Sequence, residues 1–217
     1  MIRYSSITQK IIIALAGFFL ITFLVVHLSI NLLLLRNDDG EWFTAAAHFM
    51  STNYVLKVFE VILFGGFALH ILLAILVQIQ NWWARPQHYK IGGFSHTSFF
   101  SKYMIHTGVI IILFLVIHFS NFYFVKAGWV APPTGVDRHD FYTMAQLLFS
   151  DFRYSLLYIV FMLFLGFHLN HAFQAAFQTL GLNHSKYNTA IKLAGILYSI
   201  IIPLGFAIIP MYYLWWK

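Results

Sequence analysis

Five long apolar segments constrain this chain more than any other feature of its sequence. They cover residues 11–35, 55–80, 103–126, 154–179 and 190–215. The first has about 25 residues without a formal charge, which at ~1.5 Å per residue is enough to cross a hydrocarbon core of ~30 Å. Because lipid offers an open backbone no hydrogen bonds, such segments must span as helices. The sequence therefore predicts an all-α membrane protein with five transmembrane helices.

Composition supports one membrane domain over residues 1–217. The chain is 60% hydrophobic and 9% charged, and its connectors are too short for a second domain. The net charge of +6 rests on 13 basic and 7 acidic residues, which membrane-edge lysines and arginines explain without a nucleic-acid partner. There is no cysteine, which excludes thiolate-bound iron–sulfur clusters and covalent haem attachment in this chain. We expect segment 11–35 to be retained, since it is too long for the apolar core of a signal peptide.

The charge distribution favours an N-terminus in the cytoplasm. With five spans, the side of the N-terminus, called the near side below, carries no acidic residue. Its basic residues are Arg3, Lys10, Arg85, Lys90, Lys102, Lys186 and Lys192. The opposite, far side has six basic residues and all the acidic ones. The basic counts are nearly equal, and acidic residues carry little weight in the positive-inside rule.

Histidines inside the spans form two pairs at matched depths. Six of the eleven lie in predicted spans, namely His27, His70, His106, His118, His168 and His171. Counting from the near edge places His27 at ~24 Å and His118 at ~22 Å. His70 and His168 both fall near ~15 Å, whereas His106 has no partner at its level. Since a histidine within a membrane span is costly, each matched pair is a functional-site hypothesis.

Two facing imidazoles inside a helical bundle are typical of a b-type haem, whose iron takes one nitrogen from each side. Small residues near the histidines favour close approach of either a neighbouring helix or a flat cofactor, and the glycines in question are Gly17, Gly65, Gly66, Gly108 and Gly166. The pairs are far apart and lack a clustered third ligand, which makes zinc a poor alternative. Hydrogen-bonding or ion-pathway histidines remain an alternative, and His171 competes with His168 because positions i and i+3 share a helix face.

Several short motifs occur in an order typical of one family. They are SSITQKIIIALAGFFLITFLVVHLSIN, AAAHFM, GGFALH, LVIHFSN and FHLNHAFQAAFQTLG. Together they resemble the five-helix, di-haem cytochrome b membrane-anchor subunit of succinate:quinone oxidoreductases, the single-anchor type found in succinate dehydrogenases and quinol:fumarate reductases. The resemblance covers nearly the whole chain.

The resemblance implies two b-type haems with four axial ligands. The pairs would be His70 with His168 near the cytoplasm, and His27 with His118 on the distal side. His171 would then be a neighbour of the ligand. The depth count from the residues alone gives the same pairs.

The resemblance also implies partners and a place in the respiratory chain and the tricarboxylic acid cycle. Electrons would pass between an iron–sulfur subunit and a membrane quinone, with menaquinone expected, in the cell inner membrane. Dicarboxylate chemistry would belong to a flavoprotein subunit, because this chain has no flavin fingerprint. Basic residues that would contribute to docking on the cytoplasmic face are Lys10, Arg85, Lys90, Lys102 and Lys186. Ordinary positive-inside flanks explain the same residues equally well.

Two site predictions concern protons and quinone. Some family members carry a glutamate two residues before the helix-4 ligand, where this chain has Gly166, so a glutamate-based proton pathway is doubtful here. Glu41 and His48, in the connector after the first span, are candidate quinone-site residues. Two other classes stay open: a cytochrome b subunit of a hydrogenase or formate dehydrogenase, and a haem-free transporter that uses histidines for protons.

Overall fold

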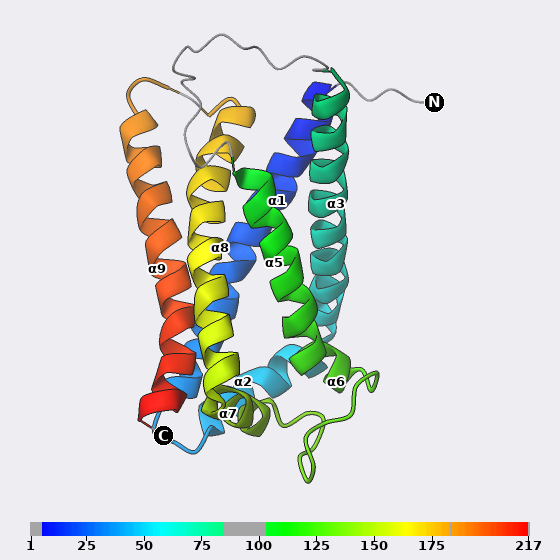
Figure 1. Cartoon of the computed structure of the whole chain (residues 1–217), viewed down its shortest axis with the longest axis vertical. Helices are drawn as coiled ribbons and strands as arrows, with labels where there is room; N and C mark the ends of the chain where they lie inside the picture. Colours follow the sequence, from blue (N-terminus) through cyan, green and yellow to red (C-terminus); the bar gives the residue numbers. More distant parts are fainter. Residues whose placement is uncertain (1–5, 85–102, 183, 217) are drawn as a thin grey trace.

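A computed structural model describes residues 6–84, 103–182 and 184–216 of the chain. Within them, five long helices stand side by side, and no strand occurs (Figure 1). They are α1 (Ser6–Asn31), α3 (Tyr54–Ala84), α5 (Met104–His118), α8 (Phe152–Thr179) and α9 (Asn188–Trp215). All five are long and apolar enough to cross a membrane, α5 together with its continuation to Lys126. The predicted all-α bundle of five spans is confirmed.

Two of the long helices continue as tighter or wider turns at the far end. α1 passes into the 3₁₀ turn η1 (Leu32–Leu35). α5 passes into the π-helical turn η2 (Phe119–Tyr123) and then α6 (Phe124–Lys126). A π-helical turn is rare and often lies at a functional site, and this one begins directly after His118.

Two short helices lie across the far end of the bundle, at the bottom of Figure 1. These are α2 (Glu41–Thr52) and α7 (Phe141–Ser150), which contact each other. The sequence predicted both only as connectors. Their buried residues, with those of η1, α8 and α9, form an apolar cluster of Leu34, Phe43, Tyr142, Ala145, Phe149, Tyr158, Ile209 and Tyr213. Asp140 caps α7 by accepting from the Thr143 N–H at 3.0 Å.

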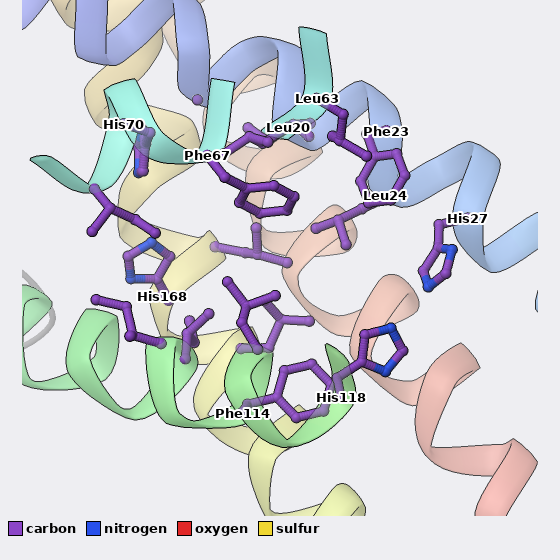
Figure 2. Close-up of a pocket in the computed structure, with 18 of the residues that line it drawn as sticks. Leu20, Phe23, Leu24, His27, Leu63, Phe67, His70, Phe114, His118 and His168 are labelled. Atoms are coloured by element: carbon purple, nitrogen blue, oxygen red, sulfur yellow. The ribbon is translucent and has the colours of Figure 1, made fainter. Parts of the chain in front are cut away.

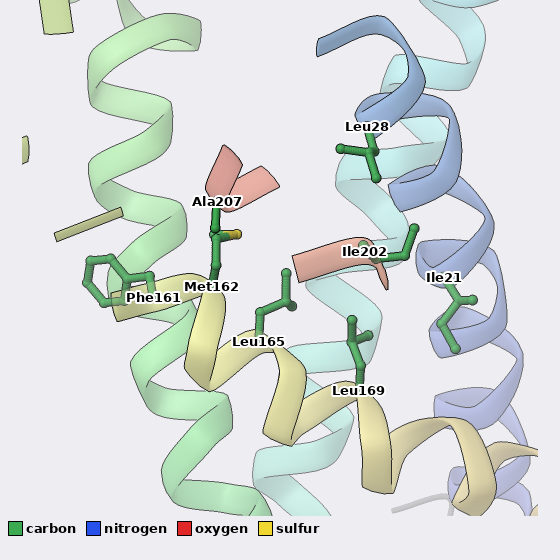
Figure 3. Close-up of a cluster of buried hydrophobic side chains, with 8 residues drawn as sticks. All are labelled: Ile21, Leu28, Phe161, Met162, Leu165, Leu169, Ile202 and Ala207. Carbon is green, nitrogen blue, oxygen red and sulfur yellow. The ribbon is translucent and has the colours of Figure 1, made fainter. Parts of the chain in front are cut away.

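A cluster of buried apolar side chains lies between α1, α8 and α9. Its buried members are Ile21, Leu28, Phe161, Met162, Leu165, Leu169, Ile202 and Ala207 (Figure 3). Gly205 of α9 allows this closeness, because a Cβ there would lie 2.7 Å from Leu28. α9 therefore serves as a rigid support for α1 and α8.

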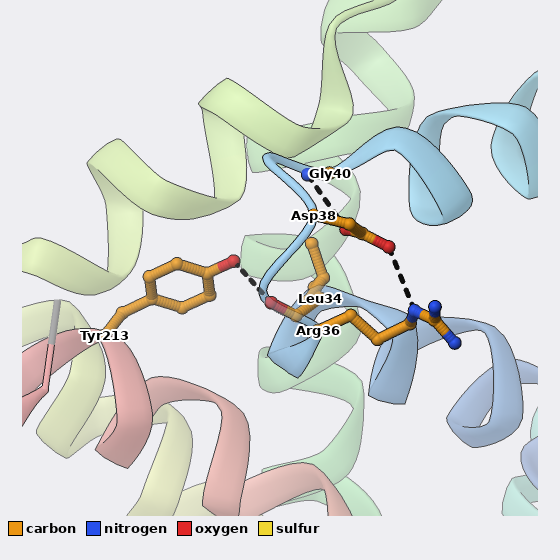
Figure 4. A network of polar contacts seen from close by, with 5 residues as sticks. All are labelled: Leu34, Arg36, Asp38, Gly40 and Tyr213. Atoms are coloured by element: carbon orange, nitrogen blue, oxygen red, sulfur yellow. Dashed lines mark hydrogen bonds and ion pairs between the residues drawn. The ribbon is translucent and has the colours of Figure 1, made fainter.

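Polar contacts also tie α9 to α1. The Tyr198 hydroxyl donates to the Ile21 carbonyl at 2.6 Å, and the Tyr213 hydroxyl donates to the Leu34 carbonyl at 2.9 Å. Figure 4 shows the second bond beside an ion pair of 2.9 Å between Arg36 and Asp38. These bonds fix α1 along the length that carries His27.

Candidate functional site: two pairs of histidines along one cavity

A large cavity runs between α1, α3, α5 and α8. Its volume is about 3080 Å³, several times the usual ~300–1,000 Å³ of a small-molecule pocket. Much of the lining is aliphatic and aromatic, and Figure 2 shows Leu20, Leu24, Leu63, Phe67 and Phe114 among it. All four histidines of the two predicted pairs line the same cavity. A cavity of this size and polarity suits flat, apolar cofactors larger than an ordinary metabolite.

His27 and His118 meet in the half of the cavity towards the far end. Their ring centroids are 5.8 Å apart, and the ring planes cross at 83° (Figure 2). An iron bound to one nitrogen of each imidazole at roughly 2 Å would hold the ring centres about 6 Å apart. The observed separation therefore fits a pair of axial ligands. Their predicted common level agrees with the structure, while their role as iron ligands stays a prediction.

Neighbouring side chains orient these two rings. Phe23 stacks on His27 at 5.2 Å, and Phe114 stacks on His118 at 5.5 Å. The Asn31 amide lies 3.4 Å from His27 Nδ1 and donates to the His27 carbonyl at 2.7 Å. His118 Nδ1 is buried without a hydrogen-bond partner among the described residues. Leaving a buried polar atom unpaired costs about 1–3 kcal/mol, so this imidazole is poised to gain from a further ligand in the cavity.

The second pair, His70 of α3 and His168 of α8, point toward one another across the cavity (Figure 2). His70 Nδ1 lies 3.3 Å from the carbonyl oxygen of Ile13 in α1. Since a carbonyl can only accept, this nitrogen must carry the proton in that bond, which leaves Nε2 of His70 with a free lone pair.

For His168, a neighbouring hydroxyl group determines which ring nitrogen carries the proton. Its Nδ1 lies 3.3 Å from Thr107 Oγ1, and the Thr107 hydroxyl donates at 2.9 Å to the Met104 carbonyl. With its only proton so used, the hydroxyl accepts from His168 Nδ1–H, and Nε2 again keeps its lone pair. Metal-bound imidazoles typically donate their other N–H to such an outer partner. The chemistry of this pair therefore fits an iron ligand set.

Two glycines make room for these rings. A Cβ on Gly17 would lie 3.4 Å from His70 Cε1, and one on Gly108 would lie 3.8 Å from His168 Cε1. Each glycine thus sits at the level of the pair to which its own helix contributes no histidine, as predicted.

The other three predicted glycines do not line the cavity. Gly65 has no neighbouring atom within 4 Å of a built Cβ, and Gly66 faces Phe19. Gly166 packs against α9, where a Cβ would lie 3.0 Å from the Ser199 carbonyl oxygen. The space at Gly166 therefore serves the close approach of two helices, which is one of the two roles predicted for these small residues.

The remaining predicted residues divide between cavity and surface. His106 and His171 line the cavity at its near end, as does Lys10. Glu41 is exposed at the start of α2 and does not line the large cavity or a second, smaller one, whereas His48 lines the smaller cavity. Lys186 is exposed. The other predicted docking residues, Arg85, Lys90 and Lys102, lie outside the described residues.

The second cavity has a volume of about 880 Å³ and contains a candidate site that the sequence analysis did not predict. It lies at the far end and contains Glu60 of α3, paired with Lys126 of α6 at 3.4 Å. Glu60 is a carboxylate six positions into an apolar span, and that signal would have singled it out.

Comparisons with models of protein families, with curated proteins and with solved structures found no match for this chain. The residues of the chain and their geometry therefore carry the functional proposal below.

Proposed function

We propose that this chain is a di-haem cytochrome b that carries electrons between an iron–sulfur partner and a membrane quinone. The observation that supports this most is the pairing of histidines from four helices along one cavity, with His27 and His118 at 5.8 Å. A haem bound between two such imidazoles supplies an iron centre that accepts and gives up one electron. The axial ligands would be His70 with His168 at the near site and His27 with His118 at the far site.

In this proposal the chain holds, orients and insulates its cofactors. Ile13 and Thr107 keep the protons of His70 and His168 on Nδ1, which leaves Nε2 free for a metal. Phe23 and Phe114 hold the rings of the far pair. The apolar lining excludes water and so influences the potential of a bound iron centre.

The motif resemblance extends the proposal to a complex and a membrane. The chain would be the membrane-anchor subunit of a succinate:quinone oxidoreductase in the cell inner membrane, with its N-terminus in the cytoplasm. The flavoprotein and iron–sulfur subunits would dock on the near side, where Lys10 and Lys186 lie, and menaquinone is the expected quinone. The enzyme activity belongs to the complex, since the chain has no cysteine for an iron–sulfur cluster.

Purification of the intact complex from its native membrane tests this function. We expect a flavoprotein to co-purify, and we expect succinate to reduce b-type haem absorption bands that fumarate reoxidises. Reduction by hydrogen or formate with no response to succinate would instead assign the chain to a hydrogenase or formate dehydrogenase. A pure, folded sample without such bands would favour the haem-free transporter.

A further inference from the structure

A charged cluster lies inside the far end of the membrane-spanning bundle. The Lys126 ammonium approaches the Glu60 carboxylate at 3.4 Å, and their side chains are only 26% and 30% exposed. Tyr123 completes the group, because its ring lies 5.7 Å from Lys126 Nζ and it lines the same two cavities as Glu60. We call Glu60, Tyr123 and Lys126 the wall cluster. Glu60 lies within its span rather than at the end, and a carboxylate there is costly, so its presence points to a function.

The wall cluster lies between two cavities. All three residues line both the large cavity that contains the histidines and the smaller far-end cavity. Polar and titratable side chains line the smaller cavity, among them His48, Lys57, Asp137, His139 and Asp140. The cluster therefore borders the histidine cavity on one side and, on the other, a cavity lined by several further titratable side chains.

Aromatic rings continue from the wall cluster to the far histidine pair. The ring of Tyr123 lies 4.7 Å from Phe64 and 6.1 Å from Phe119. Phe119 in turn lies 6.1 Å from the His118 ring. These rings offer an aromatic surface against which a flat conjugated ligand would pack.

We propose that the wall cluster binds the headgroup of a lipid-soluble quinone and exchanges its proton. This inference rests on the proposed function, because it supplies the quinone site that such a cytochrome needs. The Lys126 ammonium donates to one carbonyl oxygen of the oxidised headgroup, while Phe64 and Phe119 contact its ring. The lipid tail remains in the apolar part of the large cavity.

The proton step is balanced within the cluster. A hydroxyl O–H bond of the hydroquinone breaks, its proton forms a new O–H bond on the Glu60 carboxylate, and a hydroquinone monoanion remains. The Lys126 ammonium stabilises that anion by a charge-assisted hydrogen bond. Glu60 then releases its proton into the smaller cavity, where histidine and aspartate side chains accept it. In the reverse direction the Glu60 O–H bond breaks, and its proton forms the O–H bond of the hydroquinone from the hydroquinone monoanion.

The position of Glu60 distinguishes it from Glu41, the carboxylate that the sequence predicts for the quinone site. Glu41 is exposed and lines neither cavity, so it has no route to a ligand beside the histidines. His48 lines the smaller cavity alone and would exchange protons there without contacting the headgroup.

Equilibrium binding of menadione and of its reduced form, menadiol, tests this site in the purified complex. Calorimetry under anaerobic conditions measures both affinities, and absorption spectra of the same samples record haem content. We expect Lys126→Gln to weaken menadione and Glu60→Gln to weaken menadiol, each roughly 10-fold or more, the usual effect of losing a hydrogen bond to a charged group. Matched controls are Lys57→Gln, in the smaller cavity only, and Glu41→Gln, on the surface; both should bind as the unmodified complex does.

A third variant keeps the test decisive if the charge variants fail to fold. Phe64→Leu leaves the ion pair intact and removes one aromatic face, so menadione should bind several-fold more weakly. Unchanged affinities in all three variants, with haem spectra intact, would overturn the quinone site while leaving the proposed function standing. Haem-free protein whose menadione affinity still depends on Lys126 would instead overturn the proposed function and support the site.

Discussion

The imidazole rings of His27 and His118 lie 5.8 Å apart, from helices separated by most of the first half of the chain. His27 belongs to α1, which Tyr198 and Tyr213 of α9 bind through its carbonyls. His118 ends α5, directly before the π-helical turn. Two different helices therefore bring this pair to a separation that fits an iron between the rings.

Substitution of His118 by alanine should remove one of two haems. The cavity would keep the His70/His168 site, because that pair has its own hydrogen-bond partners. Haem quantified against protein should fall from about two to about one per chain. His106→Ala and His171→Ala serve as matched controls, since both side chains line the cavity outside the pairs, and both variants should keep two haems. Full haem content in His118→Ala would show that the pairing is wrong.

Thr107→Val should weaken haem binding at the near site, between His70 and His168, without adding bulk to the cavity. Valine has the same shape but no hydroxyl, so His168 Nδ1 loses its acceptor. Loss of such an outer partner typically costs 10–100-fold in metal affinity. Haem-retention assays during dilution should therefore show faster loss of one haem. Thr22→Val is the control, because the Thr22 hydroxyl donates to its own helix at Phe18 and contacts no histidine; equal retention in both variants would contradict the assigned role.

Gly17→Leu should abolish the near site selectively. A Cβ at this position already reaches 3.4 Å from His70, so the branched remainder of a leucine must displace the ring. One haem should be lost and the far site kept, as seen by spectral titration of the remaining haem. Gly65→Leu adds the same side chain to a helix position with no neighbour within 4 Å and should keep both. Loss of the far haem instead would contradict the level assigned to Gly17.

The sequence was sufficient for the spans and for the levels of the histidines. Apolar length determines where a helix can cross a membrane, and a rise of ~1.5 Å per residue determines depth, so His27 could be matched to His118 without a structure. The short helices α2 and α7 were missed because neither is long enough to give a spanning pattern. The contact of Gly166 with α9 was missed because depth says nothing about the direction in which a residue faces. Glu60 was overlooked although its position within a span was visible.

Tyr213→Phe should destabilise the bundle modestly. The hydroxyl that donates to the Leu34 carbonyl is lost, and a typical hydrogen bond contributes about 0.5–1.5 kcal/mol to stability. Thermal unfolding in detergent should occur at a lower temperature than for Tyr54→Phe, in which the substituted side chain is 86% exposed. Identical unfolding of the two variants would mean that this tie does not support α1.

The haem content of the purified chain is the most direct test of the central claim. Denaturing the protein in alkaline pyridine releases non-covalent haem and gives its amount and type, which can be divided by the protein concentration. The account predicts two b-type haems for each chain. A folded protein that binds no haem when it is supplied, or that keeps its haem after both His27 and His70 are replaced, would contradict it.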